Sequence, residues 1–451
     1  MPKLACYWLA AMVCSMLFAC NKKSDNTIAP PPNPRPVDTA KLILNTADSV
    51  ILIDETPTAA AEAKRLGQSF RAFDLTPTGF YLPAHATFTL EVSLLAGSNL
   101  PTLMVGTYSR YQSRWDPQAY PLKSGINTIS DGVGGILYLR FSSDNAKGKV
   151  RIRLISGMKP MPYYQLGKTT QADWEKMVDN IKDVPDVQLV GKKTILCFSL
   201  ANAALNKKEN QEALLNLADR VVVIEDSISG LFGTDPKDQP NVHKILMTES
   251  DHPGYYMAAT WYRTWYRVGD GVPAITAAHR LTWGPWHELG HMHQQSHWTW
   301  DELGEVTVNV YSLAVEKALG ITPTRLTQQN EWNNAVTFLA LPDGQRNFNN
   351  AGTSVWVRLC MFQQLKLAFG DEFYYELHKL ARRSTENVND TNAKMRWFML
   401  NACRASKHNL SDFFKKWGLQ LSNAAATNAV YSDIEGLNLP APATDLTMLK
   451  D

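Results

Sequence analysis

The sequence has no long run of basic residues, and neither sign of charge dominates it. Its 45 Lys and Arg residues nearly balance its 43 Asp and Glu residues, so the formal net charge is +2 over 451 residues. Because nucleic-acid recognition needs a basic surface, this balance argues against a nucleic-acid partner. Sustained heptads are missing too, and 13 Trp, 16 Tyr and 16 Phe residues exclude disorder or coiled coil as the main state.

Cysteine is scarce as well, with six residues in the whole chain. The three beyond residue 20 are Cys197, Cys360 and Cys403, an odd number at wide spacing. Such a set fits neither a zinc knuckle nor a disulfide framework. One disulfide and three buried thiols are both compatible with the sequence.

Long apolar runs are missing, except for the sixteen uncharged residues from Leu4 to Ala19. This run is shorter than the ~20 residues of a membrane span, and it follows Lys3 as in a signal peptide. Residues 17–20, Leu-Phe-Ala-Cys, resemble a bacterial lipobox, in which the cysteine is lipidated and becomes the mature N-terminus. A plain secretory signal cleaved nearby is the alternative. We expect residues 1–20 to be a lipoprotein signal peptide and Cys20 to be lipidated.

Proline is concentrated in residues 21–40, which hold Pro30, Pro31, Pro32, Pro34 and Pro36. Such a segment packs no core and tends to stay extended. We therefore expect a tether between the lipid and the folded body. The lipid would be the only attachment to a membrane. It would place the protein in a bacterial cell envelope, on the outer membrane and at the cell surface.

Residues 41–160 have the pattern of a β-rich N-terminal domain. Residues 87–92 and 150–155 alternate on a two-residue period, and turns rich in Gly, Pro, Asn and Ser separate the short runs. This pattern predicts a small β-sandwich.

After residue 160 the pattern changes. Helical periodicity at 172–181 and 209–218 alternates with apolar runs at 194–198 and 221–224, which predict buried strands. This alternation indicates an α/β catalytic domain over residues 161–345.

Amphipathic stretches at 355–369, 372–383 and 411–421 predict a mostly helical C-terminal subdomain over residues 346–425. Residues 426–451 carry little pattern and are expected to be a tail. The whole chain is therefore predicted to be an α+β multidomain protein.

The strongest chemical signal is the His-Glu-x-x-His motif formed by His287, Glu288 and His291, with Pro285 just before it. Proline suits the first turn of a helix, and residues four apart share one helix face. Both imidazoles can then reach one metal ion, with Glu288 beside them. His293 and His297 fall off this face and are expected to be supporting or surface histidines rather than ligands.

A catalytic zinc commonly has three protein ligands and an open position for water. Asp301, Glu302 and Glu305 are the candidates downstream, in a stretch that reads as a helix. Asp301 and Glu302 lie in its first turn, where acids stabilise the helix dipole without a further role. Glu305 shares a face with Asn309 and is the expected third ligand. Asn309 either holds a ligand in place or only packs the helix.

The motif and the segment 304–313 together resemble the viral enhancin and bacterial mucinase metallopeptidases. Their signature is His-Glu-x-x-His followed, after a variable gap, by a glutamate ligand. Residues 78–83, 241–256, 369–374 and 413–418 resemble other parts of the same family. The resemblance covers roughly residues 60–425.

The ligand set and the resemblance imply a zinc-dependent endopeptidase. His287, His291 and Glu305 would hold one Zn²⁺ per chain, and Glu288 would take a proton from the attacking water as general base. By resemblance, the substrate would be an O-glycosylated, mucin-like protein.

Three groups are candidates for stabilising the transition state: Tyr311, Tyr255 and His293. Many aromatic residues lie around the motif, and most are expected to be core, with one or two lining a sugar-accepting cleft. They are Tyr255, Tyr256, Trp261, Tyr262, Trp265, Tyr266, Trp283, Trp286, Trp298 and Trp300.

Two other functions remain open. One is a zinc peptidase that ignores sugars. The other is a non-catalytic lipoprotein that binds glycoproteins and carries a vestigial motif. The intact Glu288 argues against the second, because a binding module does not need the base.

Overall fold

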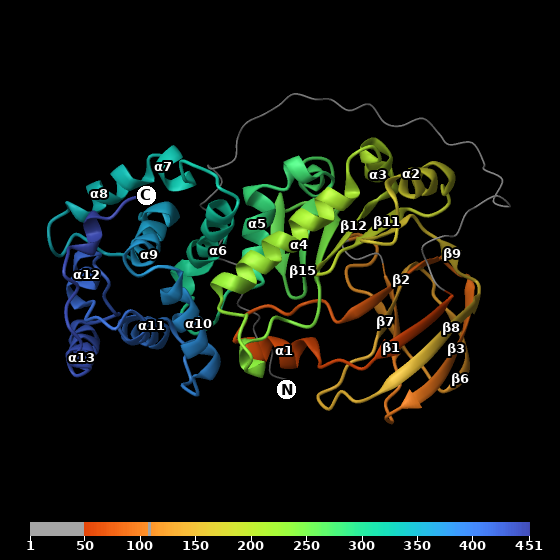
Figure 1. Ribbon diagram of the computed structural model, residues 1–451, viewed down its shortest axis with the longest axis horizontal. Helices are drawn as coiled ribbons and strands as arrows, with labels where there is room; N and C mark the ends of the chain where they lie inside the picture. Colours follow the sequence, from red (N-terminus) through yellow and green to blue (C-terminus); the bar gives the residue numbers. More distant parts are fainter. Residues whose placement is uncertain (1–48, 107–109) are drawn as a thin grey trace, which may run out of the picture. The chain divides into compact units, whose positions relative to one another are not determined.

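A computed structural model describes residues 49–106 and 110–451 (Figure 1). The expected signal peptide, Cys20 and the tether lie outside these residues. Within the described residues, no helix combines the length and the apolar character that crossing a membrane requires. Cys197, Cys360 and Cys403 are buried free thiols, so the second of the two cysteine alternatives holds.

The N-terminal part forms two antiparallel sheets that enclose one hydrophobic core. Their strand orders are β1-β8-β3-β6 and β5-β4-β7-β2-β9. The strands are β1 (Val50–Asp54), β2 (Leu75–Leu82), β3 (Thr87–Ala96), β4 (Thr102–Gly106), β5 (Gln118–Pro121), β6 (Gly125–Ser130), β7 (Gly135–Arg140), β8 (Lys149–Ser156) and β9 (Lys159–Pro160).

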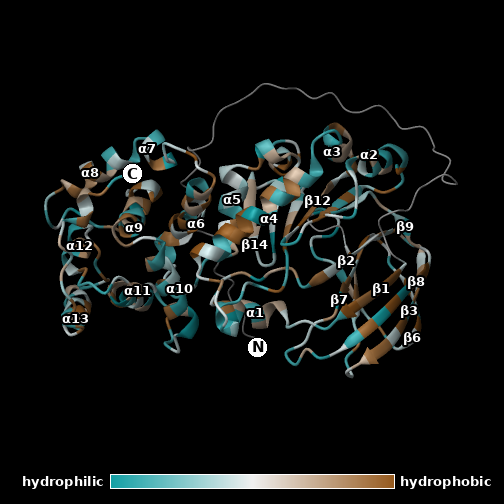
Figure 2. Ribbon diagram, in the orientation of Figure 1, coloured by the Kyte–Doolittle hydropathy of each residue, from teal (hydrophilic) through white to brown (hydrophobic). Residues whose placement is uncertain are grey.

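Alternation along the strands explains this packing. In β8, Val150, Ile152 and Leu154 are buried while the residues between them are exposed, and hydrophilic and hydrophobic colours alternate accordingly in Figure 2. They share a core with Leu103 and Leu139 of the opposite sheet. The expected β-sandwich is therefore present.

A helix interrupts this β-rich region where none was expected. Helix α1 (Ala59–Leu66) begins at Thr58, whose side chain accepts a hydrogen bond from Ala61 N. It ends at Gly67, whose φ of 67° suits a glycine at a helix C-terminus. The alanine-rich sequence between them favours a helix, so the signal was present locally.

The next region is a six-stranded mixed sheet with the order β10-β11-β12-β13-β15-β14. Its strands are β10 (Tyr163–Gln165), β11 (Asp186–Val190), β12 (Thr194–Ser199), β13 (Ile245–Ser250), β14 (Met257–Thr260) and β15 (Arg263–Arg267). Strand β14 forms one edge of the sheet and runs antiparallel to β15.

The helices of this region are α2 (Gln171–Asn180), α3 (Leu200–Asn206), α4 (Gln211–Ile228), α5 (Trp283–His291) and α6 (Gly304–Ala318), with short 3₁₀ turns η2 (Pro236–Asp238), η3 (Val272–Ile275), η4 (Ala278–Arg280) and η5 (Asp301–Leu303). The strand predicted at 221–224 is wrong, because these residues continue α4. Val221 and Val222 are buried in the core beneath the sheet, while Val223 is 50% exposed, as on a helix with one buried face.

The C-terminal region is helical, as expected. It comprises α7 (Arg325–Gln328), α8 (Glu331–Leu339), α9 (Val355–Phe369), α10 (Asp371–Arg383), α11 (Thr391–Ser406), α12 (Ser411–Lys416), α13 (Ala424–Glu435) and the turn η6 (Leu446–Met448). The last residues are not a patternless tail. They contain α13, and Trp332 donates a hydrogen bond to the Asp451 carboxylate.

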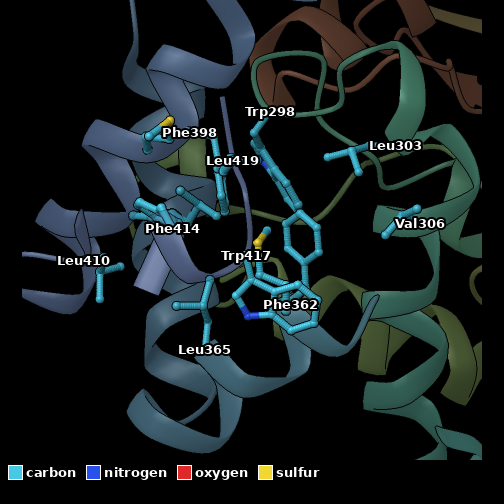
Figure 3. Packing of buried hydrophobic residues seen from close by; sticks show 14 of the residues in the cluster. Trp298, Leu303, Val306, Phe362, Leu365, Phe398, Leu410, Phe414, Trp417 and Leu419 are labelled. Carbon is cyan, nitrogen blue, oxygen red and sulfur yellow. The ribbon is translucent and has the colours of Figure 1, made fainter. Parts of the chain in front are cut away.

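Helix α6 belongs to two environments at once. Leu303 and Val306, at its start, pack with Trp298, Phe362 and Trp417 in the largest core of the helical region (Figure 3). Its other side faces α5 (Figure 1). The helical region therefore fixes the position of α6, and with it Glu305. With a β-sandwich, a mixed sheet and a helical region, the predicted α+β class is confirmed.

Candidate metal centre

The two motif histidines lie on one face of α5, which is short and starts at Trp283. Pro285 is in its first turn, as expected. Trp286 and Leu289 anchor the opposite face in the core. The rings of His287 and His291 are half-buried, and their Nε2 atoms lie 3.2 Å apart. The motif spacing therefore places two imidazole nitrogens at one point.

Glu305 completes this group from the first turn of α6. Its Oε2 lies 3.0 Å from Nε2 of His287 and 3.7 Å from Nε2 of His291. The ligand atoms of the three residues all lie within 4.8 Å of one another, and among the described residues no other such group of His, Cys, Asp or Glu occurs. The structure does not bring Asp301 or Glu302 into the group.

Gly290 permits the close approach of α5 and α6. A Cβ at this position would lie 2.9 Å from the carbonyl oxygen of Val308 and 3.3 Å from Cβ of Tyr311. Such contacts are too short for any other residue without a shift of one helix. The glycine inside the motif is therefore a packing requirement.

Two amide side chains orient the imidazoles. Nδ1 of His287 lies 2.9 Å from Oδ1 of Asn309, and Nδ1 of His291 lies 2.7 Å from Oε1 of Gln294. An amide oxygen only accepts, so each Nδ1 carries the proton and each Nε2 keeps its lone pair for a cation. Asn309 thus holds a histidine, one of its two expected roles. Gln294 was not expected, and its position three residues after His291 is only a weak signal.

The donor set fits a zinc ion. Two atoms bound tetrahedrally to one zinc at about 2.0–2.2 Å are about 3.4 Å apart. The three separations between ligand atoms are 3.0, 3.2 and 3.7 Å. Two neutral imidazoles and one carboxylate, each turned toward the others, are the ligands a catalytic zinc uses.

Glu288 follows His287 on α5 and lies between the ligand group and the edge strand β14, close enough for the charges of His287 and Glu305 to act on its pKa. Its side chain is buried, and its carboxylate accepts a hydrogen bond from the backbone N–H of Ala259 in β14. Burial raises the pKa of Glu288 to about 7. A carboxyl group with such a pKa can both accept and donate a proton near neutral pH.

Among the described residues, no further strand pairs with this side of β14. Arg267 N–H donates to Tyr256 O, so these two residues form a hydrogen-bonded pair. Along an antiparallel strand, residues whose backbone groups bond the neighbouring strand alternate with residues whose backbone groups face away from it. Met257 and Ala259 therefore direct their backbone groups away from β15, toward the edge beside Glu288. An extended peptide could pair with this edge.

Two of the expected transition-state groups lie elsewhere. His293 is buried, with Nδ1 3.0 Å from Oε2 of Glu225 and Nε2 3.3 Å from Oδ1 of Asp226. Burial disfavours its charge, but the bonds to both carboxylates prevail and raise the pKa of His293 to about 10. The hydroxyl of Tyr311 is buried 2.8 Å from the His293 carbonyl oxygen. Both residues therefore support α5 from behind, and their predicted role is wrong.

The aromatic residues divide much as expected. Trp286, Trp298, Trp300, Trp265 and Tyr266 are buried. A second set is exposed near β14, at 44–66%, and consists of Tyr255, Tyr256 and Trp261. Tyr255 packs against His252 and Trp265, and its suggested role in transition-state stabilisation stays a prediction.

Comparison with known proteins agrees with this geometry. A family model described as "Peptidase M60, enhancin and enhancin-like" matches residues 157–418. A second, for the N-terminal domain of M60-like peptidases, matches residues 57–154.

Solved structures share the fold. A functionally unknown conserved protein from Bacillus anthracis is 32% identical, with a TM-score of 0.80 over 89% of this chain and 81% of that one. The catalytic domain of ZmpC from Clostridium perfringens, solved in complex with the sialyl T antigen, is 21% identical. Its TM-score is 0.75 over 89% of this chain and 82% of that one.

A curated relative is the TRPM8 channel-associated factor homolog of Xenopus laevis. It is 24% identical over 410 residues, which is 85% of this chain and 42% of that protein. The chain therefore spans less than half the length of this relative.

Proposed function

Because this chain belongs to the peptidase M60 family of metallopeptidases, we propose that it is a zinc-dependent endopeptidase that cleaves O-glycosylated, mucin-like proteins. The observation that carries this proposal is the convergence of His287, His291 and Glu305 on one point, with Glu288 next to them on the same helix. His287, His291 and Glu305 would hold one zinc ion per chain.

Zinc at this site would supply a Lewis acid that makes a water molecule acidic enough to attack at neutral pH. Side chains and backbone groups of the protein transfer the protons, orient the histidines and hold the substrate. Glu288 accepts the proton of the attacking water and then donates a proton to the nitrogen of the departing amine. Asn309 and Gln294 keep the Nδ1 protons in place. The open edge of β14 holds the peptide main chain extended beside Glu288.

The substrate class rests on two observations. The ZmpC domain, which shares this fold, was solved with the sialyl T antigen, an O-glycan. In addition, exposed aromatic rings lie at both ends of β14. Together they favour glycoproteins over unmodified peptides as the partners of this chain.

We propose that the protein works at the bacterial cell surface, held on the outer membrane by a lipid on Cys20. The motivation is the signal-peptide pattern of residues 1–20 and the proline-rich segment that follows. Large extracellular glycoproteins reach an enzyme only when it is outside the cell.

The deciding experiment compares single variants in zinc titration and in digestion of one O-glycoprotein. Glu288→Ala should keep the metal, because Glu288 is not in the ligand group, and should lose activity by about 100- to 10,000-fold. Glu305→Ala should lose metal affinity and activity together, with activity partly restored at high zinc. Asp301→Ala is the matched control, an acid near Glu305 outside the ligand group.

Each competing function has its own signature in this experiment. Equal hydrolysis of glycosylated and deglycosylated forms of one peptide favours the peptidase that ignores sugars. Binding of the glycoprotein without cleavage, by zinc-loaded wild type, favours the non-catalytic alternative. Wild-type rates in Glu288→Ala contradict the proposed centre altogether.

A further inference from the structure

Residues 110–116, here called the sandwich loop, belong to the β-sandwich and lie just before β5. The loop is fixed to the sandwich by Arg114, which donates a 2.8 Å hydrogen bond to the buried Asp131 carboxylate. Its other residues contact the chain at both ends of β14, the strand whose Ala259 N–H bonds Glu288. The N-terminal domain therefore contacts the strand that borders the candidate metal centre.

At the first end, the sandwich loop packs on the segment that leads into β14. Tyr111 N–H donates a hydrogen bond to the Asp251 carboxylate. The ring of Tyr111 lies edge-on to the ring of His252, with 4.3 Å between the ring centres. The Trp115 ring also lies near His252, at 5.7 Å between centres. The chain is therefore held by the N-terminal domain before it enters the strand.

At the second end, the sandwich loop holds Arg263, the first residue of β15. The guanidinium carbon of Arg263 lies 4.0 Å from the centre of the Trp115 ring, and its Nη1 donates a 3.2 Å hydrogen bond to the Trp115 carbonyl oxygen. The hydroxyl of Tyr262 donates to the Asp116 carboxylate at 2.6 Å. Arg263 pairs with Thr260 across the hairpin, so the place of Arg263 sets the place of the last residue of β14.

The burial of Arg263 is unfavourable for stability. Its side chain is 1% exposed, and among the described residues its one ion pair is with Asp116, at 3.5 Å and with a side chain 63% exposed. Its Nε has no hydrogen-bond partner. Removing a cation from water costs free energy, which the face of an aromatic ring offsets only in part. A cation held in this way points to a role in fixing the geometry of the hairpin.

Strand β14 needs such support because it is the edge strand of the mixed sheet. Within the described part of the chain it pairs with β15 alone, and its four residues are only half-buried. Elements with few buried contacts open locally at low free energy. A displaced β14 would misplace an extended substrate relative to Glu288, and small errors in such positions slow catalysis strongly.

We propose that Trp115 is a positioning residue, which holds Arg263 and thereby keeps β14 where it can bind the main chain of the substrate beside Glu288. The β-sandwich then takes part in substrate binding, although it supplies no group to the ligand set. This inference rests on the proposed peptidase function and gives the N-terminal domain a role in it.

The first test separates KM from kcat in full-length, zinc-loaded protein that digests one O-glycopeptide. Trp115→Leu keeps an apolar side chain but removes the ring face, and should raise KM about tenfold while kcat and zinc affinity change less than about twofold. Trp115→Phe restores a ring and should stay near wild type. Tyr138→Phe is the matched control, because it removes a different hydrogen bond between the sandwich and the mixed sheet, from Gln188 at 2.6 Å, and should leave KM unchanged.

The second test, amide hydrogen exchange, does not depend on hydrolysis. In Trp115→Leu, the amides of residues 257–260 should exchange about tenfold faster than in wild type, while those of α5 should not change. Unchanged exchange in β14 overturns the inference, and so does faster exchange without a rise in KM. A parallel loss of zinc affinity would assign Trp115 to the fold as a whole and also overturn it. Failure of the proposed function would be seen separately, as an O-glycoprotein left uncut by wild type.

Discussion

At the scale of single residues, two amide side chains decide which nitrogen of each site histidine carries its proton. Asn309 and Gln294 each offer an oxygen to an Nδ1 atom, at 2.9 and 2.7 Å. Gln294 is itself held, because its Nε2 donates to Gly304 O and to Thr307 Oγ1. The orientation of the imidazoles is thus set before any metal arrives.

Loss of either amide oxygen should weaken metal binding without unfolding the protein. Asn309→Ala and Gln294→Ala are expected to lower zinc affinity by about 10- to 100-fold. Competition with a chromogenic chelator measures this affinity. Asn309→Asp keeps an acceptor oxygen and should keep most of the affinity. A zinc affinity in Asn309→Ala equal to that of wild type would show that the hydrogen bond to His287 plays no part.

At the scale of elements, the distance between α5 and α6 is the quantity that the fold must set. Glu305 approaches His287 only because Gly290 lets the backbone of α6 come close at Val308. On the far side, the core of the helical region holds α6 (Figure 3). From behind, the buried His293–Glu225 and His293–Asp226 contacts tie the end of α5 to α4.

A methyl group at Gly290 should separate these helices. Gly290→Ala is expected to reduce the free energy of unfolding by about 1–3 kcal/mol and to lower zinc affinity at the same time. Gly304→Ala is the control, because a Cβ there meets no atom within 4 Å, although the residue is adjacent to Glu305. Urea unfolding and zinc titration of both variants test this. If Gly290→Ala behaves like Gly304→Ala, the close approach is not what positions the ligands.

At the scale of the whole molecule, the helical C-terminal region is joined to the sheet region partly by a buried ion pair. Arg382 of α10 donates to Asp238 of η2 at 2.7 Å, and its side chain is 1% exposed. Arg383 also pairs with Asp238, at 2.7 Å. Hydrogen bonds from Arg383 and Arg382 lower the pKa of Asp238 to about 2.

This pair should stabilise the protein in a pH-dependent manner. The folded-state pKa of Asp238 lies below its ordinary value of 3.8, so the ionised form stabilises the fold above about pH 4. The shift corresponds to about 2 kcal/mol, lost as the pH falls from about 4 to about 2. Wild type should therefore exceed Asp238→Asn in unfolding free energy at pH 7, and the gap should narrow below pH 4.

Asp235→Asn is the control for this prediction, because Asp235 also bonds Arg383 but its side chain is 51% exposed. It should change stability little at any pH. A gap between wild type and Asp238→Asn that stays constant from pH 7 to pH 2 would contradict the assignment.

The proposed surface location makes a prediction about the mature chain. Mass spectrometry of protein extracted from membranes should find a lipid-modified Cys20 as the first residue. Cys20→Ala should release the protein from the membrane fraction, because no other attachment is expected. A mature chain that begins elsewhere with a free amine argues for the plain secretory signal.

Local periodicity is what the sequence by itself determined. Positions four apart on a helix share a face, so the histidine pair was readable without a fold. Two-residue alternation likewise predicted the strands at 87–92 and 150–155. Glu305 was preferred as the third ligand for a similar reason, because it shares a helix face with Asn309, four residues later.

The tertiary structure decided what depends on residues far apart in the chain. The valines at 221–224 fit a strand locally, but α4 continues through them because its buried face packs beneath the sheet. The charge of His293 depends on Glu225 and Asp226, which are more than 60 positions earlier in the sequence. The contact between Ala259 and the Glu288 carboxylate exists only once β14 pairs with β15 and lies against α5. Periodicity reports which way a side chain faces, whereas its partner is set by packing between distant segments, and the chemistry of this site depends on both.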